Sequence, residues 1–158
     1  MTKRKITIED LLALRWVSEP QVSPDGTMVV FVQLLADKEA DTYRSHLWLA
    51  PLDPSTELGA GSSPARQFTS GAHRDSSPRW SPDGRFIAFL SDRGASGGED
   101  KKKPKQIYLI RSDGGEAVPL TSGNLRPGQL VWSPDGRALA FVGKPERDQK
   151  DAGDVKVI

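Results

Sequence analysis

The chain has 158 residues, a net charge of +1, 27% charged residues and no cysteine. The near-zero net charge predicts no nucleic-acid partner, and the absence of cysteine excludes disulfides and thiolate metal sites. No apolar run reaches the roughly 20 residues that span a bilayer, which predicts no membrane partner. Glu9 and Asp10 interrupt the stretch that would follow the basic start of a signal peptide. These features predict a cytoplasmic protein.

The N-terminal segment, residues 1–16, is predicted to contain a short helix. Thr7 is a suitable N-cap, Asp10 would lie at the third helical position, and the helix would run to about Arg15. Its apolar stripe would comprise Ile8, Leu11 and Leu12. This stripe either covers the edge of a sheet or ties the chain to a neighbouring domain, and the sequence leaves both interpretations open.

The tetrapeptide Ser-Pro-Asp-Gly is the strongest signal in the chain, because it occurs three times. The copies lie at 23–26, 81–84 and 133–136. Each copy follows Val22, Trp80 or Trp132 and precedes a run rich in β-formers. Proline presets φ for the first central position of a tight turn, and glycine accepts positive φ. Each copy therefore predicts a β-hairpin, and this explanation fits all three aspartates better than a metal site does.

Two further short strands follow the hairpin in the first two repeats. Residues 47–50 match 107–110, and residues 65–71 match 117–123. Four short strands in a unit of about 50 residues are typical of a β-propeller blade. We therefore expect an all-β fold, a partial β-propeller of two four-stranded blades plus the start of a third, with a short N-terminal helix. The expected units are a helical segment at 1–16, blade 1 at 17–71, blade 2 at 72–123 and an incomplete blade 3 at 124–158.

Long polar segments separate these strands. Residues 36–45, 91–105 and 143–153 are rich in charge and would join the second and third strands of their blades, while 53–64 is rich in Pro, Ser and Gly. All four are predicted to be exposed loops.

A blade buries its faces only against neighbouring blades, and propellers usually have about 4–8 of them. Two and a half blades would leave apolar faces and strand edges open. The sequence therefore predicts a fragment, a truncated reading frame or a short protein that assembles into a homo-oligomer.

The candidates for chemistry are weak. Ser96 lies in a G-x-S-x-G pattern at 94–98, but no strand leads into it and no helix pattern follows. The basic run 101–105 adjoins acidic residues and is interpreted as a solvated hairpin tip, and neither His46 nor His73 has metal-ligating company. We expect no catalytic, cofactor-binding or metal-binding residue in this chain.

With these residues in view, the chain resembles the N-terminal propeller of the prolyl oligopeptidase family of serine peptidases, in the acylaminoacyl-peptidase-like branch. The resemblance rests on residues 17–26 after the opening helix, on the repeated Trp-Ser-Pro-Asp-Gly and on residues 154–158. It implies a propeller that sits over a C-terminal α/β-hydrolase domain and restricts the access of peptide substrates. It also implies that the catalytic triad lies in that domain, so this chain alone is expected to be inactive. Non-enzymatic, protein-binding propellers of the Tol-Pal type share the repeat and are the alternative.

Overall fold

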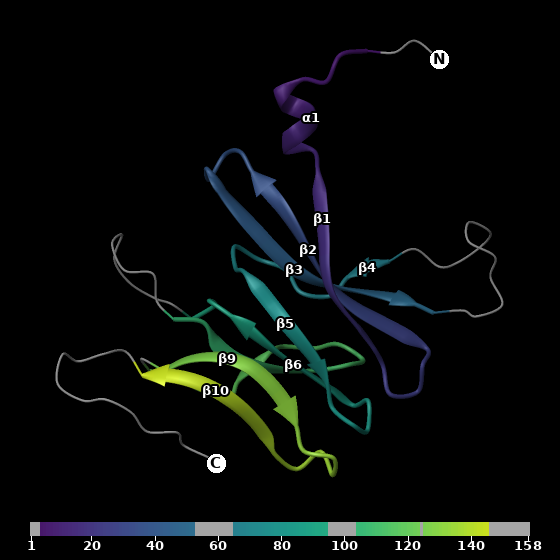
Figure 1. Cartoon of the computed structure of the whole chain (residues 1–158), viewed down its shortest axis with the longest axis vertical. Helices are drawn as coiled ribbons and strands as arrows, with labels where there is room; N and C mark the ends of the chain where they lie inside the picture. The colour runs from purple at the N-terminus through teal and green to yellow at the C-terminus, as the bar shows by residue number, and fades with distance from the viewer. Residues whose placement is uncertain (1–3, 53–64, 95–103, 124, 146–158) are drawn as a thin grey trace.

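A computed structural model describes residues 4–52, 65–94, 104–123 and 125–145. Within these ranges the chain forms one short helix and ten strands (Figure 1). The elements are α1 (Ile8–Leu12), β1 (Arg15–Val22), β2 (Met28–Asp37), β3 (Thr42–Pro51), β4 (Arg66–Gln67), β5 (Asp75–Trp80), β6 (Phe86–Ser91), β7 (Gln106–Arg111), β8 (Val118–Pro119), β9 (Leu125–Trp132) and β10 (Leu139–Pro145).

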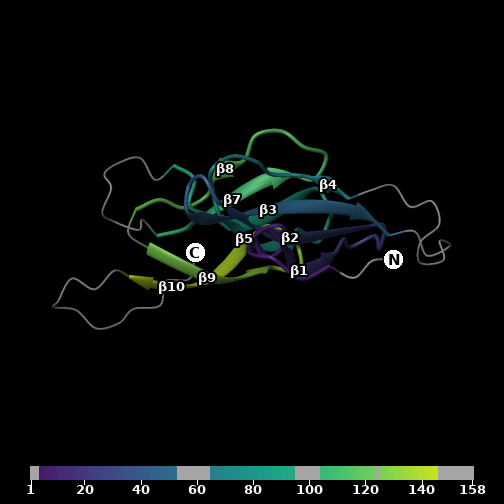
Figure 2. The same cartoon turned by 90° about the horizontal axis from the view of Figure 1, so that it is seen from above.

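The strands form three antiparallel sheets that follow chain order. The sheets are β1-β2-β3-β4, β5-β6-β7-β8 and a pair made of β9 and β10. The first strands of successive sheets lie next to one another, so β1, β5 and β9 form the inner side of a fan (Figures 1 and 2). This arrangement confirms the predicted partial propeller with two four-stranded blades and the start of a third.

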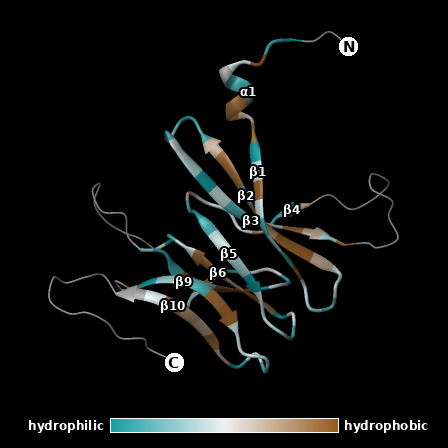
Figure 3. Cartoon of the chain, in the orientation of Figure 1, coloured by the Kyte–Doolittle hydropathy of each residue, from teal (hydrophilic) through white to brown (hydrophobic). Residues whose placement is uncertain are grey.

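The core lies between the blades because each strand alternates its side chains between the two faces of its sheet. Val30, Val32, Leu47 and Leu49 of blade 1 pack on Ile87, Phe89, Tyr108 and Ile110 of blade 2. Ala88, Leu90 and Ile107 on the other face of blade 2 pack on Leu130 of blade 3. Figure 3 shows these strand segments as apolar and the connecting turns as polar. Full burial of one such aliphatic or aromatic side chain contributes about 1.5–3 kcal/mol.

The three Ser-Pro-Asp-Gly turns have the same hydrogen bonds. In the second copy the Ser81 hydroxyl donates to Asp83 Oδ1 at 2.6 Å and accepts the Phe86 N–H at 2.9 Å, and the Gly84 N–H donates to the Ser81 carbonyl at 2.9 Å. The glycines have φ of 74°, 70° and 70°. The serine bond is the main reason why the pKa of Asp83 lies below its ordinary value. The predicted turns are therefore confirmed, and in each copy the aspartate carboxylate bonds within its own turn.

Several predicted boundaries were wrong. The helix ends at Leu12 rather than near Arg15, where β1 already begins. The expected loop at 36–45 is mostly strand, because β2 and β3 pair in register from Met28 with Pro51 to Asp37 with Thr42. Residues 143–145 also belong to a strand, while 53–64 and 146–153 lie outside the described residues. The stretch 91–105 does separate β6 from β7.

Candidate functional site

The inner strands carry matching β-bulges. The pairing of β1 with β2 shifts register between Ser18 and Gln21, and that of β5 with β6 shifts between Ser76 and Arg79. Within the bulges Glu19 has φ 53° and Ser77 has φ 55°. Residues other than glycine rarely adopt such left-handed backbone, so the surrounding structure must hold it in place.

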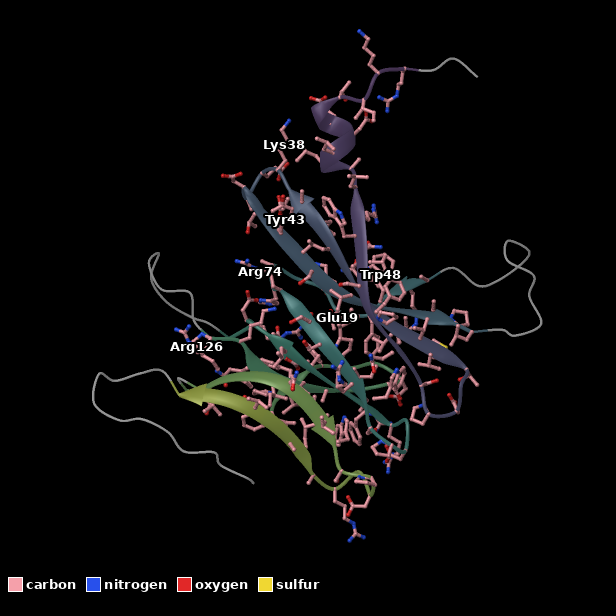
Figure 4. The ribbon with its side chains drawn as sticks, viewed as in Figure 1. Glu19, Lys38, Tyr43, Trp48, Arg74 and Arg126 are labelled. Carbon is pink, nitrogen blue, oxygen red and sulfur yellow. The ribbon has the colours of Figure 1, made fainter. Side chains whose placement is uncertain are left out.

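A side-chain bond crosses between the two bulges. The Ser77 N–H, which the bulge removes from the ladder, donates to Glu19 Oε2 at 2.5 Å. Figure 4 shows Glu19 where β1 passes close to β5. The carboxylate thus satisfies a backbone donor of the next blade on the inner side of the fan.

Two tryptophans link neighbouring inner strands nearer the turns. Trp80 Nε1 donates to the Gln21 carbonyl and Trp132 Nε1 donates to the Arg79 carbonyl, both at 3.1 Å. Beside these indoles the inner strands line an open hollow of about 290 Å³. Its lining comprises Gln21, Val22, Pro24, Arg79, Trp80, Leu130, Val131 and Trp132. Because the lining comes from the first strand of each blade and from Pro24, the hollow lies on the inner side of the fan.

A buried ion pair lies at the other end of the interface between blades 1 and 2. Asp75 is fully buried, and its Oδ2 accepts a bond of 2.7 Å from Arg93, whose guanidinium also lies over the Phe89 and Tyr108 rings. The Ser45 hydroxyl of blade 1 donates to the Asp75 carbonyl at 2.8 Å. This cluster therefore joins the beginning of β5 both to β3 of blade 1 and to the segment that follows β6 in blade 2.

The candidate residues that the structure describes are His46, His73 and Lys105. His46 is buried in β3, its Nδ1 has no hydrogen bond among the described residues, and burial lowers its pKa. His73 lies before β5. Lys105 Nζ donates to the Ser76 hydroxyl at 2.8 Å, and burial lowers the pKa of this ammonium, so this end of the basic run is not a freely solvated tip.

Ser96 and residues 101–103 lie outside the described residues. Within the described ranges no group of three or more His, Asp or Glu side chains could hold a metal ion. In the same ranges no helix is long and apolar enough to cross a bilayer.

Sequence reasoning missed Glu19, Asp75 and Arg93. One signal was available for the first: Glu19-Pro20 and Ser77-Pro78 stand at the same distance before their turns, and proline inside a strand pattern marks a bulge. No comparable signal pointed to the ion pair.

Comparison with family models gives no match. Among curated proteins the chain is 38% identical over 137 residues to the uncharacterized peptidase YuxL of Bacillus subtilis, covering 87% of this chain and 19% of that protein. It is 32% identical over 95 residues to dipeptidyl-peptidase 5 of Porphyromonas gingivalis, covering 60% of this chain and 13% of that protein. The chain thus spans about a fifth or less of the length of these relatives.

Solved structures show the same fold. Acylaminoacyl peptidase of Pyrococcus horikoshii matches with 23% identity and a TM-score of 0.58, over 94% of this chain and 20% of that one. The β-propeller domain of the Trilobed protease from Pyrococcus furiosus matches with 22% identity and a TM-score of 0.56, over 85% and 35%. A putative TolB from Agrobacterium tumefaciens matches with 25% identity and a TM-score of 0.56, over 82% and 39%.

These likenesses define the class of the chain, which is a segment of a β-propeller. The curated peptidase relative then confirms the resemblance to the N-terminal propeller of a prolyl oligopeptidase family peptidase.

Proposed function

We propose that this chain is the first part of the propeller of a serine peptidase of the acylaminoacyl or oligopeptidase type. In this role it restricts the access of peptides to an α/β-hydrolase domain that lies outside the chain. The observation that carries the proposal is the 38% identity to a peptidase over 87% of this chain. The parent protein would act in the cytoplasm.

The geometry supports a gating role better than a chemical one. The inner strands are fastened to each other by the Glu19 carboxylate and by the Trp80 and Trp132 indoles, so their side chains are committed to holding blades together. A ring of fastened blades leaves an axial passage for an extended peptide and excludes a folded protein. Catalysis in the parent would come from the Ser, Asp and His triad of the hydrolase domain.

Activity measurements on the parent protein and on this chain test the proposal. The parent should hydrolyse acyl-peptide and peptide nitroanilide substrates, and this chain should not. Ser96→Ala in the parent should leave turnover unchanged. A parent reading frame without a hydrolase domain, or loss of turnover in Ser96→Ala, would overturn the proposal.

The second candidate is a protein-binding propeller without an enzyme, which the 25% identity to a putative TolB favours. Fractionation of cells that express the tagged parent protein separates the two functions. A periplasmic protein without peptidase activity supports the binding propeller, whereas a cytoplasmic peptidase supports the gate.

A further inference from the structure

The hollow beside Trp80 and Trp132 lies where the inner strands end. Strands β1, β5 and β9 each run toward a Ser-Pro-Asp-Gly turn, and these turns lie at the end of the fan away from α1 (Figure 1). The blades of a propeller surround a central channel, so further blades would complete the ring without covering the inner side of these strands. The hollow of about 290 Å³ would therefore stay open to the channel of the parent protein.

One position of the repeat gives the hollow its polarity. Gln21, Arg79 and Val131 each stand two residues before the serine of a turn, and all three line the hollow. The turns that follow are identical, whereas this position holds an amide, a guanidinium and an aliphatic side chain. Among the described residues of the lining, Arg79 is the only charged one. The inner wall therefore has a single cationic place, on the middle strand, between a polar neighbour and an apolar one.

The Arg79 guanidinium has donors to spare. Arg79 is half-buried, and its Nη1 donates to the Pro78 carbonyl at 2.7 Å. A guanidinium has five N–H donors, and among the described residues no carboxylate forms an ion pair with Arg79. Arg93, by contrast, is paired with Asp75 at 2.7 Å. A partly desolvated guanidinium without a counter-ion favours an anion, and a carboxylate can accept two of its N–H groups at once.

The rest of the lining suits an apolar group. The Nε1 atoms of Trp80 and Trp132 are already bonded to carbonyls of the preceding blade, so these residues offer a ligand only the apolar surface of their rings. Val22 and Pro24 add aliphatic surface beside them. Concave sites that are mostly apolar, with a few polar groups that fix the orientation of the ligand, are typical of binding sites for small molecules. The hollow therefore suits a ligand that carries an apolar group next to a carboxylate.

We propose that the hollow binds the C-terminal residue of a peptide, with the carboxylate on Arg79 and an apolar side chain against the indole rings. The inference rests on the proposed function, because it takes its ligand from the peptides that enter the channel. Capture of a C-terminal carboxylate is a recurring mode of peptide recognition. A nucleic acid would need several cations along its backbone, which the described lining does not supply. The hollow is thus an entry subsite that selects peptides with a free, apolar C-terminal residue.

Photo-crosslinking with the full-length parent protein tests the inference. The probe is an acetylated Gly-Ser peptide that ends in p-benzoylphenylalanine with a free carboxylate, so the apolar C-terminal side chain is also the crosslinker. Treatment of the parent with phenylmethylsulfonyl fluoride beforehand prevents cleavage of the probe. Irradiation should give crosslinks to the turn-side ends of β1, β5 and β9. The same probe with an amidated C-terminus should give about tenfold fewer crosslinks, as expected when a hydrogen bond between charged groups is lost.

Two variants of equal net charge locate the carboxylate. Arg79→Gln should lower the crosslinking yield of the free-carboxylate probe by about tenfold and leave the yield of the amidated probe unchanged. Arg85→Gln is the matched control, because Arg85 is exposed directly after the same turn and is not part of the lining. This control should give the same yields as the unaltered parent.

Competition tests the apolar part of the site. An unlabelled peptide that ends in Leu should reduce the crosslinks, and a peptide that ends in Ser should reduce them much less. Crosslinks outside the three inner strands, equal yields from the free and amidated probes, or equal losses in Arg79→Gln and Arg85→Gln would overturn the inference.

These measurements do not require turnover, so they separate the inference from the proposed function. If the parent cleaves peptide nitroanilides and the crosslinks fail, only the entry subsite falls. If the parent has no hydrolase domain, the proposed function falls, and the crosslinks decide the binding site on their own.

Discussion

The indole Nε1 of Trp80 donates a hydrogen bond of 3.1 Å to the carbonyl of Gln21 in the preceding blade. Trp132 makes the same bond to the Arg79 carbonyl. The repeated tryptophan therefore fixes the position of each inner strand, along the strand direction, relative to the inner strand of the preceding blade. Blade 1 has Val22 at this position, and Val22 is exposed.

Removing one indole donor should weaken the interface between blades 1 and 2. Trp80→Phe leaves the Gln21 carbonyl without this donor and should cost about 1–2 kcal/mol of unfolding free energy. Trp48→Phe is the matched control, because the Trp48 indole nitrogen is buried without a hydrogen bond among the described residues. Urea unfolding of the propeller in the parent protein measures both, and equal losses would show that the indole bond contributes nothing.

Substitution of the turn glycines by alanine should destabilise the fold because these glycines have positive φ, and not because an added Cβ would be crowded. A Cβ at Gly26 would meet nothing within 4 Å, whereas at Gly136 it would lie 3.5 Å from Pro82. Both have positive φ, so alanine should cost about 1–2 kcal/mol at either position. Unfolding of the two variants measures this, and a large loss confined to Gly136→Ala would point to crowding instead.

His46 should make the propeller less stable in mild acid. Burial lowers the pKa of this imidazole, so the unfolded chain binds the proton more readily than the folded chain does. Stability should fall as the pH drops below the ordinary histidine value of about 6.5. His46→Gln, which copies Gln106 at the matching position of blade 2, should remove this fall, while His73→Gln should retain it. A pH profile of the melting temperature that is unchanged in His46→Gln would contradict the assignment.

The buried ion pair should show strong coupling. Asp75→Ala leaves the largely buried Arg93 guanidinium unpaired and should cost about 3–5 kcal/mol. Asp75→Ala/Arg93→Met should cost much less than the two single changes combined, because it removes both charges. The exposed pair of Arg111 and Asp113 is the control, and its removal should have little measurable effect. Additive losses at the buried pair in a double-mutant cycle would refute the coupling.

Local patterns predicted the blades, because each Ser-Pro-Asp-Gly turn is held by bonds among six consecutive residues. The ion pair escaped prediction because its partners stand 18 residues apart and have no repeated counterpart: Val17 and Leu35 occupy the matching places in blade 1. Residues 36–45 were predicted as a loop because they are rich in charge. The long β2–β3 pairing overrides that composition, and such pairing depends on contacts that no local pattern records.

The most direct test of the gate compares short and long substrates of the parent protein. The measurement is the ratio of kcat/KM for an acyl-peptide nitroanilide to that for a long unfolded polypeptide, before and after Trp80→Phe/Trp132→Phe. If the fastened blades restrict access, the parent should strongly prefer the short substrate, and the double variant should lose much of this preference through faster cleavage of the long one. A ratio that stays unchanged while the interface is measurably weakened would contradict the account.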